Sequence, residues 1–269
     1  MCSACLRALL LLTMLLFAGE ASARELRVCA DPNNLPFSND RLEGFENKLV
    51  DIVGKALDAK VTYVWWAQRR GYVGEALDTG LCDLFPGIGR VPGVLLTYPP
   101  YYRSAYAFVT RSDEEPFRSL DDPRLRSLTV GIQLVGGDNA SSPPAAALAR
   151  RGITENVRGY SVFGNYADPN PPAAIVAAVA NGDVDVAIAW GPLAGYFAAL
   201  ADPPLTVTPL ADYFDDDLPM QFDISMALRL DEGPLRLEIE RALDEHRAEI
   251  DNLLAIYHVP RIDLAEGAL

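Results

Sequence analysis

The sequence predicts an α/β protein with two similar lobes, each a mixed, mainly parallel sheet flanked by helices. Strand-like and helix-like segments alternate after residue 24, a pattern of small residues and aspartates recurs at a constant offset, and two strand-like segments join the copies. Alternation of this kind is typical of a parallel sheet covered by helices. The helices are too short and the strands too few for a barrel.

The first copy contains three expected strands and two expected helices. The strands are short apolar runs at 25–30, 60–66 and 82–88. Between them, apolar residues recur with helical spacing at 44–57 and 72–79, and Gly80 ends the second helix.

The same arrangement recurs in the second half of the chain. Asp83 is matched by Asp185, 102 positions further on, and the same offset relates the segment at 27–29 to that at 129–131. It also relates Ala76, Leu77, Gly80 and Gly89 to Ala178, Val179, Gly182 and Gly191. Two lobes of one design follow from this repeat.

Two segments, 101–110 and 222–230, are expected as strands that cross between the lobes, and 234–257 has the periodicity of an amphipathic helical stretch. We therefore predict a first lobe from 24–112 and 222–269, a second lobe from 113–221, and a two-strand hinge. Ligands of such sheets bind at the carboxyl ends of the strands, where two facing lobes form a cleft. Hinge closure around a cleft suits a binding protein.

Residues 1–23 are predicted to be a cleaved secretory signal peptide. Arg7 precedes an apolar run from Ala8 to Ala18, and Ala21-Ser22-Ala23 provides a small-x-small site. The run is too short to span a bilayer well, so we expect a periplasmic chain without membrane insertion. The net charge of −14 disfavours nucleic acids and anionic membranes as partners.

Two cysteines, Cys29 and Cys82, remain after Cys2 and Cys5 leave with the signal peptide. An even pair in an oxidising compartment predicts one disulfide, and two buried free thiols are the alternative.

An enzyme, a cofactor and a metal site are not expected. The only histidines, His246 and His258, stand near no nucleophile motif, and neither zinc-ligand spacing nor a phosphate loop occurs. Asp31 and Asp138 are the alternative as a catalytic acid and base. The acidic run at 212–217 could hold a hard cation or meet a basic partner, with a solvated turn as the alternative.

Several motifs, in this order, resemble those of type-II, amino-acid-type solute-binding proteins: Pro36-Phe37, Gly44-Phe45-Glu46 and Pro100-Tyr101-Tyr102. Longer strings are similar to the MoxJ/XoxJ-like group found with quinoprotein methanol dehydrogenases. They are CADPNNLPFSN at 29–39, WWAQRRG at 65–71 and WGPLAGY at 190–196. This resemblance implies a non-catalytic periplasmic accessory that binds or matures a PQQ-dependent alcohol (methanol) dehydrogenase through its cleft.

One departure from the amino-acid-binding pattern bears on the ligand. Those proteins clamp a carboxylate with an arginine shortly before Pro-Tyr-Tyr, because the guanidinium fork matches a carboxylate. Here Val91 takes that place, with Arg90 one residue off, and Asp138 would repel an anion in the second lobe. The alternative function is therefore a transport receptor for a small solute other than a standard amino acid.

The loops after the strands supply the candidate cleft residues. They are Asn33, Asn34, Phe37, Trp66, Arg69, Gly87 and Tyr102 in the first lobe, and Gly136, Asp138, Asn139 and Trp190 in the second. Phe37 and Trp66 either stack on a ligand or pack in the core or at the interface between the lobes. Arg69 either meets an anion or an acidic surface or begins a solvated helix, and Trp190 either faces the cleft or caps its lobe.

Overall fold

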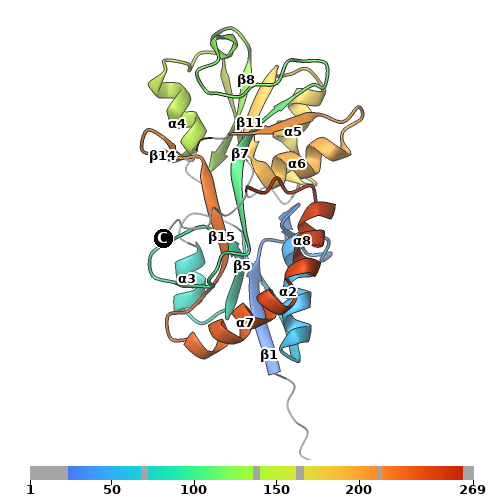
Figure 1. Ribbon diagram of the computed structural model, residues 1–269, viewed down its shortest axis with the longest axis vertical. Helices are drawn as coiled ribbons and strands as arrows, with labels where there is room; N and C mark the ends of the chain where they lie inside the picture. The colour runs from blue at the N-terminus through green and yellow to red at the C-terminus, as the bar shows by residue number, and fades with distance from the viewer. Residues whose placement is uncertain are drawn as a thin grey trace, which may run out of the picture.

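The computed structural model of the 269-residue chain describes residues 24–67, 72–135, 140–161, 167–210, 212 and 214–262. Two lobes lie one above the other along the longest axis, with helices on the faces of their sheets (Figure 1). The predicted two-lobed α/β fold is confirmed. The predicted signal peptide at 1–23 lies outside the described residues.

The first lobe is built on a parallel sheet. Strand β1 (Arg24–Ala30) lies between β4 (Ala59–Trp65) and β5 (Leu84–Ile88) and is parallel to both. Helix α2 (Phe45–Ala56) connects β1 to β4, and α3 (Tyr72–Asp78) connects β4 to β5. The expected order of strand, helix, strand, helix, strand is therefore present.

The second lobe repeats this design. Strand β8 (Val130–Val135) lies between β10 (Val157–Ser161) and β11 (Val186–Trp190), and all three are parallel. Helix α4 (Pro143–Arg150) connects β8 to β10, and α5 (Ala174–Ala180) connects β10 to β11.

Both lobes also contain smaller elements. They are α6 (Gly191–Leu200), the 3-10 turns at Pro123–Arg126 and Pro171–Ala173, and short strands at Asn33–Asn34, Ser38–Asn39, Leu95–Leu96, Ala140–Ser141, Thr206–Pro209, Phe214–Asp215 and Leu218–Pro219.

The repeat seen in the sequence is a repeat of hydrogen bonds. The Asp83 carboxylate accepts from the backbone N–H of Arg27 at 3.0 Å, and Asp185 accepts from that of Thr129 at 2.8 Å. The N–H of each aspartate returns a bond to the carbonyl of the same partner, at 2.8 and 2.9 Å. Each aspartate thus holds its own segment against the neighbouring strand, at Arg27 within β1 and at Thr129 just before β8.

Two long strands join the lobes, as predicted. Strand β7 (Tyr102–Thr110) pairs antiparallel with β11 in the second lobe, and β15 (Gln221–Leu228) pairs antiparallel with β5 in the first. The two strands pair with each other over four residues, and a buried Arg103 forms an ion pair with Asp223 across them at 2.7 Å. The predicted lobe boundaries fall just after β7 and within β15, and this division stays a prediction.

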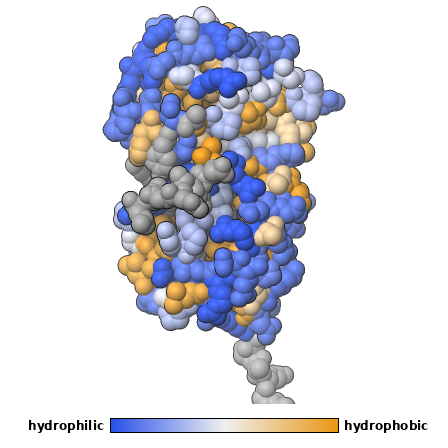
Figure 2. All heavy atoms as spheres, in the orientation of Figure 1, coloured by the Kyte–Doolittle hydropathy of each residue, from blue (hydrophilic) through white to orange (hydrophobic). Residues whose placement is uncertain are grey.

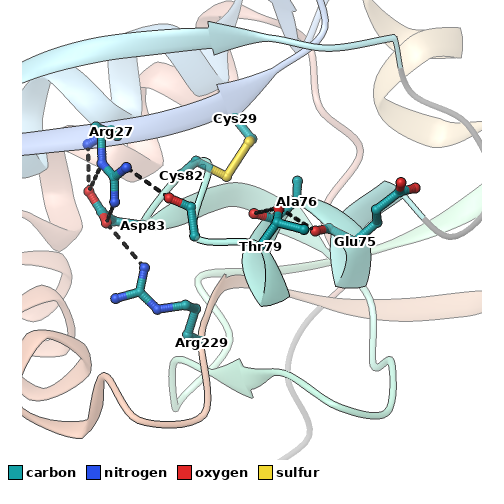
Figure 3. The surroundings of a disulfide bond; sticks show 9 residues. Arg27, Cys29, Glu75, Ala76, Thr79, Cys82, Asp83 and Arg229 are labelled. Atoms are coloured by element: carbon teal, nitrogen blue, oxygen red, sulfur yellow. Dashed lines mark hydrogen bonds and ion pairs between the residues drawn. A yellow bond between two sulfur atoms is a disulfide. The ribbon is translucent and has the colours of Figure 1, made fainter.

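The disulfide predicted from the cysteine count is present. Cys29 in β1 and Cys82 before β5 are bonded, with their Cα atoms 5.6 Å apart, and both are fully buried. Beside them, Asp83 forms ion pairs with Arg27 and Arg229 (Figure 3). The disulfide therefore links β1 to the segment that leads into β5, close to the cleft.

The expected helical stretch at 234–257 is two helices. Helix α7 (Gly233–Glu245) and α8 (Arg247–Ile256) are separated at His246, whose φ and ψ of −103° and 17° interrupt the helix. Leucine and isoleucine side chains on one side of both helices pack into the core of the first lobe, which matches the predicted periodicity.

The end of the described chain forms a third link between the lobes. The Ser104 hydroxyl donates to the carbonyl of Pro260 at 2.5 Å, and the Ile262 N–H donates to that of Arg103 at 3.0 Å. The rings of Tyr257 and of Tyr196 in α6 stack with centroids 5.6 Å apart.

Hydrophilic side chains cover most of the face in Figure 2, in keeping with the high net charge. None of the helices in the described ranges is long and apolar enough to cross a membrane.

Candidate functional site

A cavity of about 210 Å³ lies between the lobes at the carboxyl ends of the strands. The first lobe lines it with the loop after β1 and with the end of β5, and the second with the ends of β8 and β11. Tyr102 and Ile224 contribute from the hinge strands. The predicted cleft therefore coincides with a cavity, and residues of both lobes and of the hinge strands form its wall.

The start of α2 explains how the Gly44-Phe45-Glu46 motif builds this wall. A Cβ at Gly44 would lie 2.0 Å from the carbonyl oxygen of Phe37, so only glycine lets the loop approach this closely. Backbone N–H groups of Phe45 and Glu46 donate to the carbonyls of Pro36 and Phe37 at 2.8 and 2.9 Å. These bonds satisfy the first N–H groups of the helix and place Glu46 beside the cavity.

Glu46 is a buried carboxylic acid that lines the cavity. Burial raises its pKa from 4.5 to about 8, so the acid is largely neutral at pH 7. A Cβ at Gly87 would lie 2.0 Å from the Glu46 Oε1 and 2.9 Å from the Tyr101 hydroxyl oxygen. The absent side chain at position 87 therefore makes room for both polar groups.

The tyrosines beside Glu46 are buried too. Desolvation raises the pKa of Tyr101 and of Tyr102 well above the ordinary value, and the nearby Glu46 adds to this. The Tyr101 hydroxyl has no hydrogen-bond partner among the described residues. Buried polar groups without partners are uncommon, and they often belong to sites that a ligand completes.

Asp31 organises the loop that follows β1. Its carboxylate accepts from the backbone N–H of Asn33 at 2.8 Å, and its carbonyl accepts from the Ser38 hydroxyl at 2.8 Å. Asp31, Asn34 and Ser38 are all buried and line the cavity. The first-lobe wall is therefore polar and held in place by its own hydrogen bonds.

Trp190 lines the cavity and packs at the hinge. Its ring meets those of Tyr106 and Phe222 edge-on, with centroids 5.5 and 5.7 Å away. Its backbone N–H donates to the Gln133 side chain at 2.7 Å, which fixes an amide that also lines the cavity.

Phe37 lies at the meeting of the lobes. It packs on Phe45, with ring centroids 5.4 Å apart, and against an apolar cluster of the second lobe. It also lines the cavity, as Asn34, Gly87 and Tyr102 do. Phe37 therefore packs between the lobes and also contributes to the cavity wall, and its stacking on a ligand stays a prediction.

Asn33 does not line the cavity; its side chain hydrogen-bonds one lobe to the other. Its side-chain Nδ2 donates to the carbonyl of Asp168 at 2.9 Å, and its Oδ1 accepts from the N–H of Asn170 at 3.3 Å. Asn33 belongs to the first lobe and its two partners to the second. The lobes are therefore hydrogen-bonded to each other across the cleft.

Other predicted site residues stand apart from the cavity. Trp66 is half-buried and packs against the apolar cluster around the disulfide, because it follows β4 on the side of α3. Arg69, Gly136, Asp138 and Asn139 lie outside the described residues. Arg90 is exposed and does not line the cavity.

Sequence reasoning did not select Glu46, Ser38 or Gln133 for the cleft, and it named Asp31 only as a catalytic alternative. Glu46 follows Phe45, whose side chain belongs to the apolar core. In the sequence, an acidic residue at this place in a helix looks like an ordinary exposed residue of the first turn. Its place in the Gly-Phe-Glu motif was the available signal.

Two arginines form ion pairs with aspartates of the acidic run at 212–217. Arg151 pairs with Asp215 at 2.6 Å, and Arg150 pairs with Asp217 at 2.5 Å. No group of three or more metal-ligating side chains gathers within the part of the chain that the structure describes. Asp215 and Asp217 therefore form ion pairs with the arginines at the C-terminal end of α4.

Two lobes of this α/β design, joined by a two-strand hinge around a cavity at the carboxyl ends of the strands, define a type-II periplasmic binding protein fold. No protein-family model matches the sequence. The chain is 31% identical over 256 residues to protein MoxJ of Methylorubrum extorquens, covering 90% of this chain and 83% of that protein. It belongs to the MoxJ family.

Two solved structures agree with this assignment. The periplasmic binding protein XoxJ from Methylobacterium extorquens AM1 superposes with a TM-score of 0.72 at 34% identity, over 88% of this chain and 99% of that one. MxaJ from Methlophaga aminisulfidivorans MPT superposes with a TM-score of 0.77 at 27% identity, over 88% and 100%. The similarity therefore includes both lobes and the hinge.

Proposed function

We propose that the chain is a non-catalytic periplasmic accessory of a PQQ-dependent methanol or alcohol dehydrogenase, which it binds or matures through its interlobe cleft. Membership of the MoxJ family supports this, since relatives match along nearly the whole chain and one of them is a periplasmic binding protein. The strings that resemble proteins of methanol-oxidation systems lie around the cleft, at 29–39 and 190–196.

The observation that carries the proposal furthest is the chemistry of the cavity wall. Among the described residues that line it there is no lysine, arginine or histidine, whereas Asp31 and Glu46 are acidic. A free amino acid brings a carboxylate that needs a cationic clamp. The described wall offers no such clamp, so the cleft suits a task other than capture of a standard amino acid.

The described lining residues also favour binding over catalysis. Cys29 is held in the disulfide, and Ser38 donates its hydroxyl to a backbone carbonyl. Neither forms the pair of nucleophile and base that covalent catalysis requires. Asp138, one half of the alternative acid–base pair, lies outside the described residues.

A second candidate is a transport receptor for a small solute that is not a standard amino acid. Asn33 hydrogen-bonds the two lobes to each other, and lobes that come together around a ligand are typical of a receptor. The two candidates share the cleft and differ in what enters it.

Binding of the mature chain to the methanol dehydrogenase of the same organism tests the proposal. The dehydrogenase is prepared without and with PQQ, and each form is titrated at low and at physiological ionic strength. We expect saturable binding that is tighter to the apo form. The affinity should fall as the salt concentration rises, because salt screens the attraction between an acidic surface and a basic partner. Absence of binding to both forms at both salt concentrations would refute the accessory role and leave the receptor.

A further inference from the structure

The cavity combines carboxyl groups with aromatic rings. Asp31 and Glu46 face it from the first lobe, Phe37 and Tyr102 from the loop after β1 and the hinge, and Trp190 from the second lobe. Carboxylates beside aromatic faces attract organic cations, since the ring quadrupole and the negative charge act together. The described wall supplies no basic group that would oppose a cation.

Glu46 is the buried acid in this wall that lacks a partner. No hydrogen bond or ion pair of its side chain is found within the described ranges, and desolvation alone accounts for its raised pKa. The titratable groups near it are Tyr63 from β4, Tyr101 just before β7, Tyr102 at the start of β7, and Asp31, which lines the same cavity. All of these groups are neutral or acidic, so none neutralises an ionised Glu46.

We propose that the cavity binds a small organic cation whose ammonium group pairs with the Glu46 carboxylate and lies among the rings of Phe37, Tyr102 and Trp190. The cation replaces the proton that Glu46 carries in the empty cavity, so binding releases one proton to solvent. A volume of about 210 Å³ corresponds to roughly seven water molecules at ~30 Å³ each. A ligand of about that many heavy atoms, such as choline, matches this space.

This inference deepens the proposed function, because it concerns the same cleft, yet its test does not need the dehydrogenase. An ammonium group could come from a free amine or from a lysine side chain of a docked protein. Both sources share the chemistry that the cavity recognises, and a competition experiment separates them.

The test is calorimetry on the mature chain with choline and with its neutral isostere 3,3-dimethylbutan-1-ol. We expect choline to bind at least about tenfold more tightly than the alcohol, because its quaternary ammonium attracts the carboxylate and the aromatic faces without needing an N–H donor. Titrations at pH 7 in two buffers with different ionisation enthalpies should show nearly one proton released per choline. The affinity should rise as the pH increases toward 8 and level off above it, because the pKa of Glu46 is about 8.

The matched variants are Glu46→Gln and Glu249→Gln. Glu46→Gln should lose the proton release and at least about tenfold in choline affinity, whereas Glu249, exposed on α8 beside His246, should leave both unchanged. Circular dichroism confirms that each variant is folded before it is titrated. Equal binding of choline and the alcohol, or wild-type proton release in Glu46→Gln, would contradict the inference. So would no binding of choline, tetramethylammonium and butylammonium alike.

Competition with the dehydrogenase identifies the natural source. Displacement of the enzyme by choline assigns the ammonium group to a lysine of the partner, and a bound enzyme that choline does not displace assigns it to a free amine. If choline binds and the dehydrogenase does not, the accessory role fails while the cation site stands. If the dehydrogenase binds and choline does not, the reverse holds.

Discussion

The buried carboxyl of Glu46 predicts a specific dependence of stability on pH. In the unfolded chain this group ionises near its ordinary pKa of 4.5, and in the folded chain near 8. Between these values the folded state keeps a proton that the unfolded state releases. The free energy of unfolding therefore falls as the pH rises, by up to about 1.4 kcal/mol per pH unit. The contribution is fully present below pH 4.5 and is lost as the pH rises through 8.

Over the whole window, this difference corresponds to roughly 5 kcal/mol for a single group. Glu46→Gln removes the ionisation and keeps the shape, so its stability relative to wild type should increase steadily from about pH 5 to about pH 8. A buried amide without a partner adds a cost that does not vary with pH. The slope of the difference, rather than its absolute value, is therefore the quantity to measure.

Urea denaturation of both proteins at several pH values gives this slope, because the other titrating groups cancel in the difference. Glu249→Gln serves as the control, since its carboxylate is exposed and should produce no comparable slope. A difference between Glu46→Gln and wild type that stays constant over this pH range would refute the assignment of Glu46 as a buried neutral acid.

Three further predictions concern packing, covalent structure and closure. Gly87→Ala should destabilise the fold by about 1–3 kcal/mol, because a Cβ there meets the Glu46 carboxyl; Gly74→Ala in α3, with open space around it, should cost nothing in the same urea titration. Replacing Cys29 and Cys82 together by alanine should lower the free energy of unfolding by about 4 kcal/mol, given the 53-residue separation, and a loss below about 1 kcal/mol would contradict this. Asn33→Ala removes two interlobe hydrogen bonds, together worth roughly 2 kcal/mol, so the radius of gyration from small-angle scattering should increase; an unchanged scattering profile would show that other contacts hold the cleft closed.

Periodicity and the internal repeat predicted most of the fold. The 102-residue offset corresponds to equivalent hydrogen bonds of Asp83 and Asp185, because the repeat preserves the contact between each aspartate and the backbone of its partner, Arg27 or Thr129. The break at His246 was not predicted, since apolar residues keep their helical spacing on both sides of it. A periodic pattern reports which face is buried and does not report a local change of backbone angle.

The site was predicted less completely than the fold. Asn34 and Phe37 line the cavity from the loop after β1, Gly87 and Trp190 from the ends of β5 and β11, and Tyr102 from the start of β7. The rule that ligands bind at the carboxyl ends of strands selected most of them. Trp66 obeys the same rule and packs beside the disulfide instead. Glu46 was missed because it comes from the start of a helix, and only tertiary packing brings that helix end to the cavity.

Blocking the cavity tests the central claim, that the cleft is the binding element, most directly. Gly89 lines it, and a Cβ there would touch only the Phe222 ring at 3.5 Å, so Gly89→Leu can fill the space without a backbone clash. Gly74→Leu is the matched surface variant. The affinity of each variant for the methanol dehydrogenase is measured beside wild type. A loss of at least about tenfold (~1.4 kcal/mol) for Gly89→Leu, with Gly74→Leu unchanged, is the predicted result. Wild-type affinity in Gly89→Leu would contradict the account.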